Sequence, residues 1–376
     1  MAVDPEQIQA ITAATMRLYR SAEWQLLQLV TRYLAEGLDG PTWAADRLAA
    51  LAALRRAAQD IIGQLDDEAA GEIATAVAEA YRAGSGAALT DLPADEATRL
   101  AAQEATALVP RIAPVEALAV ALVQDVGPRH SNVLRNVLDV YRTVVAQATA
   151  VSIAGGQTRR QAAQYAYQRL VDQGVTSFTD VTGRRWRLSS YVEMALRTVT
   201  QRAAVQGQTD RLERLGIATV IVSNEAQECP RCRPYEGKVL RTTAGPVGQL
   251  QLTNALTGQL VAVDVLATLE DARSKGFQHP NCRHVVRAYL PGVTKRPTGP
   301  TEDPEGDKAR QRQRAIERSI RAWKEREAAA LDDGARKAAA SKVRAWQGAM
   351  RHHLGANPNL KRLTYREQIG AGNTPR

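Results

Sequence analysis

The residues best suited to chemistry in this chain are its cysteines and two neighbouring histidines. All 3 cysteines, Cys229, Cys232 and Cys282, lie in one stretch with His279 and His284. The Cys229-x2-Cys232 turn presents two thiolates, Cys282 supplies a third, and either His279 or His284 supplies a fourth ligand. Cys3His is one of the standard closed ligand sets of structural zinc. The sequence therefore predicts a structural Zn²⁺ site, with the choice between the two histidines left open.

Two other interpretations of these residues compete with the metal site. In the first, the cysteines are small buried hydrophobic residues and the histidines are ordinary ones. In the second, Cys229 and Cys232 form a redox dithiol, but that motif needs a βαβ context that the sequence around it lacks. A disulfide framework is disfavoured, because 3 cysteines in 376 residues is an odd and low number.

A short segment of mixed secondary structure is expected to position the cysteines. The β-branched run 218–222 predicts a buried strand, and 238–241 and 260–263 predict shorter strands. Before them, a helix is expected to run to about Leu215, with a capping box at Ser190 and Glu193 and a C-terminal cap at Gly216.

The first half of the chain is rich in alanine and shows helical periodicity. Glycine and proline predict where its helices stop: at Gly84-Ser85-Gly86, at Gly127-Pro128 and at Gly155-Gly156. The expected helices cover 5–38, 42–82, 94–126 and two segments within 129–174.

The end of the chain carries the excess positive charge. The net charge is +9, and residues 308–376 hold 17 Lys and Arg against 6 Asp and Glu. A Pro- and Gly-rich linker at 291–307 precedes this basic helical tail. Such a tail favours a polyanion such as DNA, and the alternative is a solvated charged surface. The candidate nucleic-acid contacts are Arg312, Arg314, Arg318, Arg321, Lys324, Lys342 and Arg344.

The stretch from Gly183 to Gly292 resembles the phage minor capsid proteins of the minor capsid protein 2 type, relatives of the portal-associated head-morphogenesis proteins. The matching motifs are Gly183-Arg184-Arg185-Trp186, Ser190-Tyr191-Val192-Glu193-Met194, Cys229-Pro230-Arg231-Cys232, Pro234-Tyr235-Glu236-Gly237 and His279-Pro280-Asn281-Cys282-Arg283-His284. The resemblance covers about a third of the chain directly. In related head proteins the position of His284 is often a cysteine, which favours His284 over His279 as the fourth ligand.

The resemblance implies a virion protein of the phage head, close to the portal and assembled in the bacterial cytoplasm. Its implied partners are the portal and other head proteins, whereas DNA is expected as a further partner from the charge of the basic tail, which the resemblance does not cover. Its implied role is head assembly, or DNA packaging or delivery.

The expected fold is mainly α, in four parts. These are an N-terminal helical region (1–126), a minor-capsid core with a small α+β zinc-knot module (127–290), a linker (291–307) and a basic helical tail (308–376).

We expect a structural protein and no enzyme, no small-molecule substrate and no membrane partner. The sequence lacks a Walker loop and the motifs G-x-G-x-x-G, H-E-x-x-H and G-x-S-x-G. Its first residues lack the apolar region of a targeting segment. Two alternative functions stay open. One is a zinc-supported nuclease using His279, Asn281 and His284, and the other is a non-specific DNA-binding protein of the virion.

Overall fold

The computed structural model is mainly helical, as predicted, and carries one five-stranded sheet. It describes residues 3, 5–92, 112–153, 157–225, 230–279, 282–297 and 303–369. The chain forms two compact units. Residues 1–13, 72–122 and 194–308 make unit 1, and residues 14–71, 123–193 and 309–376 make unit 2. The four-part division expected from the sequence stays a prediction.

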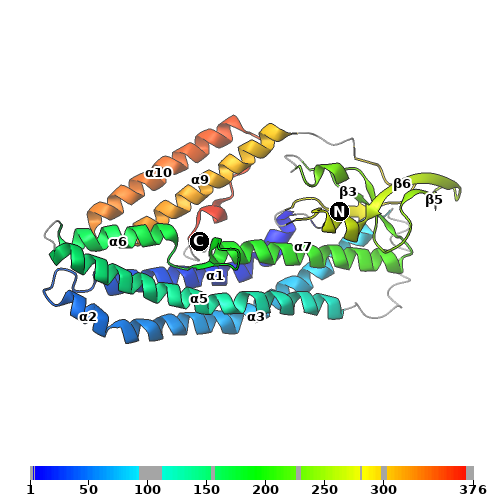
Figure 1. Cartoon of the computed structure of the whole chain (residues 1–376). Helices are drawn as coiled ribbons and strands as arrows, with labels where there is room; N and C mark the ends of the chain where they lie inside the picture. The colour runs from blue at the N-terminus through cyan, green and yellow to red at the C-terminus, as the bar shows by residue number, and fades with distance from the viewer. Residues whose placement is uncertain are drawn as a thin grey trace. The chain divides into compact units, whose positions relative to one another are not determined.

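Helices and strands follow one another as labelled in Figure 1. The helices are α1 (Pro5–Ala35), α2 (Trp43–Ala49), α3 (Leu51–Thr90), α5 (Ile112–Ile153), α6 (Arg159–Gln173), α7 (Leu188–Arg214), α8 (Leu269–Ser274), α9 (Pro304–Ala328) and α10 (Asp333–Ala356). The strands are β1 (Ser177–Thr179), β2 (Arg185–Arg187), β3 (Thr219–Val222), β4 (Val239–Arg241), β5 (Gly248–Thr253), β6 (Leu260–Thr268) and β7 (Val286–Ala288). Two short 3-10 helices are η1 (Arg233–Tyr235) and η2 (Thr364–Glu367).

The sheet of unit 1 has the strand order β5-β6-β4-β3-β7. Strand β3 pairs antiparallel with β4 on one side and with β7 on the other. Its side chains alternate between two apolar clusters: Val220 and Val222 belong to the larger one, and Ile221 belongs to the smaller one. A central strand that is buried on both faces explains the continuous β-branched run in the sequence.

Glycines 84 and 86 do not end a helix, contrary to the prediction, because α3 continues to Thr90. A Cβ at Gly84 would lie 1.8 Å from the carbonyl oxygen of Ala204 in α7. A Cβ at Gly207 of α7 would lie 2.0 Å from the carbonyl oxygen of Tyr81 in α3. The two backbones therefore approach one another closely, and glycine is needed for contact between the helices rather than for a turn.

The predicted stop at Gly127-Pro128 is also wrong, because α5 contains Pro128 in its interior. The next residue, Arg129, donates from its guanidinium to the carbonyl oxygen of Asp125 and to the hydroxyl of Tyr191. These side-chain bonds reinforce the helix where proline removes a backbone donor. Helix α7 starts at Leu188, before the predicted capping box, and Glu193 instead forms an ion pair with Arg20.

Helices α9 and α10 form an antiparallel hairpin in unit 2 (Figure 1). Its own core consists of Ile316, Ile320 and Met350, which are almost fully buried. At the turn between the two helices, Asp332 caps α10 by accepting from the amide of Ala335 at 2.8 Å. The expected linker is shorter than predicted, because α9 already begins at Pro304.

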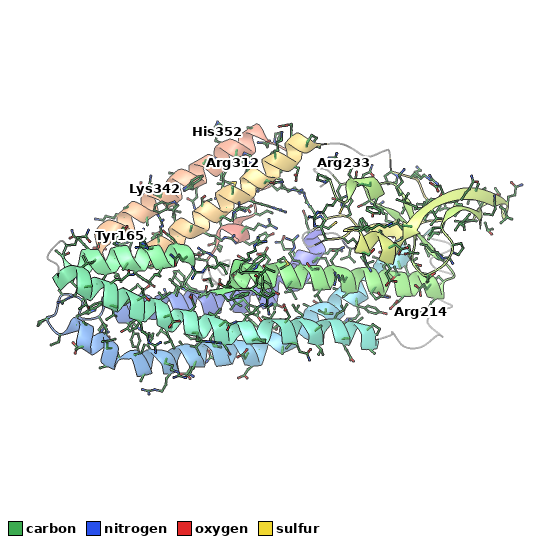
Figure 2. All side chains as sticks on the ribbon, viewed as in Figure 1. Tyr165, Arg214, Arg233, Arg312, Lys342 and His352 are labelled. Carbon is green, nitrogen blue, oxygen red and sulfur yellow. The ribbon has the colours of Figure 1, made fainter. Side chains whose placement is uncertain are left out.

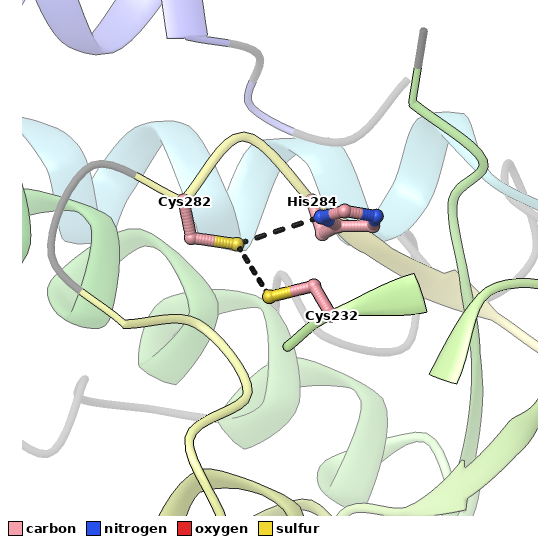
Figure 3. A group of neighbouring side chains, drawn as sticks. All are labelled: Cys232, Cys282 and His284. Carbon is pink, nitrogen blue, oxygen red and sulfur yellow. Dashed lines mark hydrogen bonds between the residues drawn. The ribbon is translucent and has the colours of Figure 1, made fainter. Parts of the chain in front are cut away.

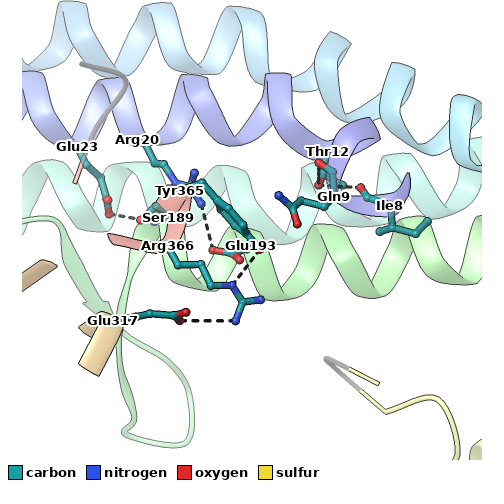
Figure 4. Close-up of polar contacts among 10 residues, drawn as sticks. All are labelled: Ile8, Gln9, Thr12, Arg20, Glu23, Ser189, Glu193, Glu317, Tyr365 and Arg366. Atoms are coloured by element: carbon teal, nitrogen blue, oxygen red, sulfur yellow. Dashed lines mark hydrogen bonds and ion pairs between the residues drawn. The ribbon is translucent and has the colours of Figure 1, made fainter. Parts of the chain in front are cut away.

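Ion pairs and hydrogen bonds join this hairpin to the rest of unit 2. Glu325 of α9 pairs with Arg187, and Arg326 donates two hydrogen bonds to the carboxylate of Asp172. The C-terminal segment adds Arg366, which lies 3.9 Å from Glu317 (Figure 4). Burial raises the pKa of Glu325 above its ordinary value, whereas the charge of Arg187 acts to lower it. Removing one partner of such a pair leaves the other charge partly buried and unpaired, which lowers stability.

We predict opposite effects of alanine at two glycines of α3. Gly84→Ala forces Cβ into the backbone of Ala204 and lowers the free energy of unfolding by about 1–3 kcal/mol. At exposed Gly86, no atom lies within 4 Å of the new Cβ. Gly86→Ala therefore raises the free energy of unfolding by about 0.5–1 kcal/mol. Thermal and denaturant unfolding of both variants measures the difference, and equal values would contradict the close approach of α3 and α7.

Candidate metal centre

The pairing of β3 brings the cysteine segments to one end of the sheet. Because β3 is antiparallel to both neighbours, its C-terminal end lies beside the starts of β4 and β7. Cys232 lies shortly before β4, and Cys282 and His284 lie shortly before β7. Backbone bonds fix this end: Gly237 donates to the carbonyl of Val222 at 3.1 Å. Segments 50 positions apart in the chain are thus held against one another.

Cys232, Cys282 and His284 form a compact group of soft and borderline ligands (Figure 3). The two sulfur atoms lie 3.5 Å apart, and Sγ of Cys282 lies 3.5 Å from Nδ1 of His284. All three ligand atoms lie within 4.8 Å of one another. Cys232 is 0% exposed and His284 is 3% exposed. Two of the three ligand side chains are therefore shielded from bulk water, and Cys282 is partly exposed.

These distances fit a tetrahedral zinc ion. With Zn–S near 2.3 Å and Zn–N near 2.0 Å, tetrahedral geometry places two sulfurs about 3.8 Å apart, and a sulfur and a nitrogen about 3.5 Å apart. The observed separations are both 3.5 Å. A disulfide needs a sulfur separation of about 2.05 Å, and both cysteines are free thiols. The arrangement suits a metal better than a covalent bridge.

A buried carboxylate stands behind the histidine. Oε1 of Glu236 lies 2.7 Å from Nε2 of His284 and accepts a second hydrogen bond, at 2.9 Å, from the amide of Glu225. The side chain of Glu236 is 0% exposed. With Nε2–H donating to Glu236, the lone pair of Nδ1 is directed to the side of Cys282, as in the carboxylate–histidine–metal arrangement. Glu236 was not predicted, because a single Glu before a turn glycine carries no signal of burial.

Burial and close contacts shift the pKa values of Cys232 and His284. The hydrogen bond with Cys282, together with burial, raises the pKa of Cys232 to about 12. Burial acts to lower the pKa of His284, but hydrogen bonds with Cys232 and Glu236 outweigh it and raise the pKa above its ordinary value. Without a metal, Cys232 therefore keeps its proton, and a bound metal would displace it, since coordination deprotonates a thiol.

His279 and Cys229 have different positions relative to this group. The carbonyl oxygen of His279 accepts from the amide of Cys282 at 2.9 Å, which closes the turn between them. The metal-ligand group among the described residues contains His284 and not His279. Cys229, the predicted partner of Cys232, lies outside the described residues, as does Asn281.

The structure separates the predicted nucleic-acid contacts by exposure. Four of them are exposed, and three on α9 are partly buried. Among the partly buried three, Lys324 donates to Gln368 at 3.1 Å, and the charge of Arg314 acts on Glu317. The exposed residues are Arg312, Arg318, Lys342 and Arg344, and the partly buried residues are Arg314, Arg321 and Lys324.

Comparison with known proteins assigns the family. The family model described as phage minor capsid protein 2 matches residues 3–355. This chain belongs to the phage minor capsid protein 2 family. The resemblance seen between Gly183 and Gly292 is thereby confirmed and extends over nearly the whole chain.

One curated relative of this chain is a phage structural protein. It is a protein of Lactococcus phage LL-H named "Structural protein", 26% identical over 240 residues. The match covers 61% of this chain and 62% of the relative, so the chain spans less than two thirds of that protein. No solved structure matches the chain. In the described part, the minor capsid protein has no helix with the length and apolar character needed to cross a membrane.

We predict that the two histidines differ in their effect on bound metal. His284→Ala removes a ligand and leaves the buried carboxylate of Glu236 without its partner, so the purified variant loses most of its zinc. His279→Ala keeps the backbone carbonyl that closes the turn, so it retains about one zinc per chain. Elemental analysis of both variants beside the wild type measures this, and metal loss in His279→Ala alone would refute the assignment.

Proposed function

We propose that Cys229, Cys232, Cys282 and His284 bind one structural zinc ion that stabilises the sheet end of unit 1. The support is the group of Cys232 and His284, both buried, with the partly exposed Cys282, whose printed spacings match tetrahedral coordination. Cys229 completes the set because the C-x2-C turn presents both thiolates to one ion. His279 has the role of a turn residue.

The zinc ion has no catalytic role in this proposal. Four protein ligands leave no open position for water. His284 is 3% exposed, and its ring nitrogens already face Cys282 and Glu236. This argues against the alternative of a zinc-supported nuclease, in which a histidine must reach a phosphodiester. We therefore propose that this protein has no enzymatic activity.

The family match over residues 3–355 carries the proposal for the whole protein. It is a minor structural component of a tailed phage head, located near the portal and in contact with the portal or other head proteins. It acts in head assembly, or in packaging or delivering DNA, and is incorporated during assembly in the bacterial cytoplasm. The alternative of an isolated DNA-binding protein receives less support, because basic side chains such as Arg187 and Arg326 are used in internal ion pairs.

We predict that zinc removal affects the sheet of unit 1 specifically. Chelation, or Cys282→Ser, removes a ligand and makes residues 217–290 sensitive to protease, while unit 2 stays folded because it lacks the site. Limited proteolysis with mass spectrometry locates the cuts. Re-adding zinc restores resistance in the wild type but not in Cys282→Ser. Unchanged resistance of 217–290 in the chelated protein would eliminate the structural role of the metal.

We predict that deleting the gene from the phage impairs the formation of infectious heads. Without the protein, the phage yields few infectious, DNA-filled heads, and supplying the wild-type chain restores them. Quantitative mass spectrometry of purified particles is expected to find few copies per virion, with labelling at one vertex. Absence of the protein from purified particles, with normal phage yield, would contradict a structural role.

A further inference from the structure

The two helices of the C-terminal hairpin use their basic side chains differently. On α9, Arg326 pairs with Asp172, and Lys324 bonds to Gln368. Burial lowers the pKa of Arg321 despite the opposing charges of Glu193 and Glu325. Much of the positive charge of α9 is therefore used to attach the hairpin within unit 2.

The positive charge of α10 is left uncompensated. After Asp333 at its start, this helix of 24 residues has no acidic side chain. Arg336 pairs with Asp333, but no described residue forms an ion pair with the helix's other lysines and arginines. These are Lys337, Lys342, Arg344 and Arg351, and all four are exposed. Figure 2 shows Lys342 and His352 directed outward from α10.

Three of these charges form a line along the outer face of the helix. Lys337, Arg344 and Arg351 are spaced by seven residues, which keeps them on one side of an α-helix at intervals of about 10.5 Å. The residues four positions after Lys337 and Arg344 are small, Ser341 and Gly348, and Gln347 is the longer polar side chain beside them. The opposite side carries buried residues of the hairpin. A rod-like partner can therefore approach the backbone of α10 closely along the line of charges.

The types of side chain on this face indicate which class of partner binds it. A stable protein–protein interface is normally anchored by buried aromatic or aliphatic side chains. The outer face of α10 offers only basic, polar and small side chains, whereas Val343 and Met350 are buried. A polyanion needs only such charges, because phosphate contacts release counterions and require no apolar anchor.

We propose that the outer face of α10, defined by Lys337, Arg344 and Arg351, binds the phosphate backbone of nucleic acid without reading its sequence. His352 flanks this face, whereas Lys342 lies on another side of the helix. The proposal deepens the DNA-handling part of the proposed function and rests on it, and it restricts the contact to α10, where Arg344 is the one residue of this face among the predicted contacts. Arg321 and Lys324 are excluded from the contact by their internal interactions.

The test compares two triple variants of the full chain that remove equal charge. One is Lys337→Gln/Arg344→Gln/Arg351→Gln on α10. The control is Lys308→Gln/Arg312→Gln/Arg318→Gln, at exposed positions of α9. Binding of a fluorescent random-sequence 30-base-pair duplex is measured by anisotropy from low to moderate salt. Thermal unfolding verifies that both variants fold as the wild type does.

The wild type is expected to bind with affinity that falls linearly with salt on logarithmic axes. The α10 variant should lose about three counterion-releasing contacts, so the slope decreases by about 2.7 and affinity falls at least about tenfold at low salt. The α9 control should keep a slope close to that of the wild type. Equal losses in the two variants, or no duplex binding by the wild type at low salt, would overturn the proposal.

Incorporation into phage particles distinguishes this inference from the proposed function. The folded α10 variant is expected to enter heads at the normal copy number while DNA binding is lost. If duplex binding fails but incorporation is normal, the phosphate-binding face is wrong and the structural role stands. If the wild-type chain never enters heads, the structural role fails whatever the duplex measurements show.

Discussion

The pairing of β3 with a strand on each side is the constraint on which the candidate metal centre depends. Antiparallel pairing on both sides places the segments before β4 and before β7 at one end of the sheet. The thiols of Cys232 and Cys282 then lie 3.5 Å apart although the residues are far apart in the chain. Three-residue strands are short for an independent sheet. A metal at this end would compensate for the few ladder bonds that β4 and β7 supply.

Charge is used in two different ways in this protein. In unit 1, the buried carboxylate of Glu236 orients His284. In unit 2, partly buried pairs such as Arg187–Glu325 attach the C-terminal hairpin, which was predicted as a basic helical tail. Net charge alone therefore exaggerates the positive surface of residues 308–376. The exposed remainder is concentrated on α10, where no acidic residue follows Asp333.

Elements that depend mainly on neighbouring residues in the chain were predicted correctly from the sequence. The β-branched run 218–222 became β3, and Gly216 caps α7 with a φ of 75°. Glycine and proline were misinterpreted where packing overrides local preference. Gly84 lies within α3 because α7 approaches it, and Pro128 lies within α5 next to the side-chain bonds of Arg129. Such causes are contacts with distant segments, which a single sequence does not display.

The residue types of the candidate metal centre could be predicted from the sequence, but their arrangement in space could be predicted only in part. Cysteine and histidine spacing indicated a ligand set and left His279 and His284 as alternatives. Tertiary structure was needed to place His284 beside Cys282 and to reveal Glu236 behind it. Strands β1, β2, β5 and β7 were not predicted. Three of them have only three residues, too few for a period-two pattern to be recognised.

X-ray absorption at the zinc edge of the purified full chain tests the central claim most directly. About one zinc per chain is expected, with three sulfur neighbours near 2.3 Å and one nitrogen near 2.0 Å. That result would identify the cysteines and one histidine as a closed structural site. Absence of zinc from protein purified reduced and without chelator, or a shell of oxygen and nitrogen without sulfur, would contradict it.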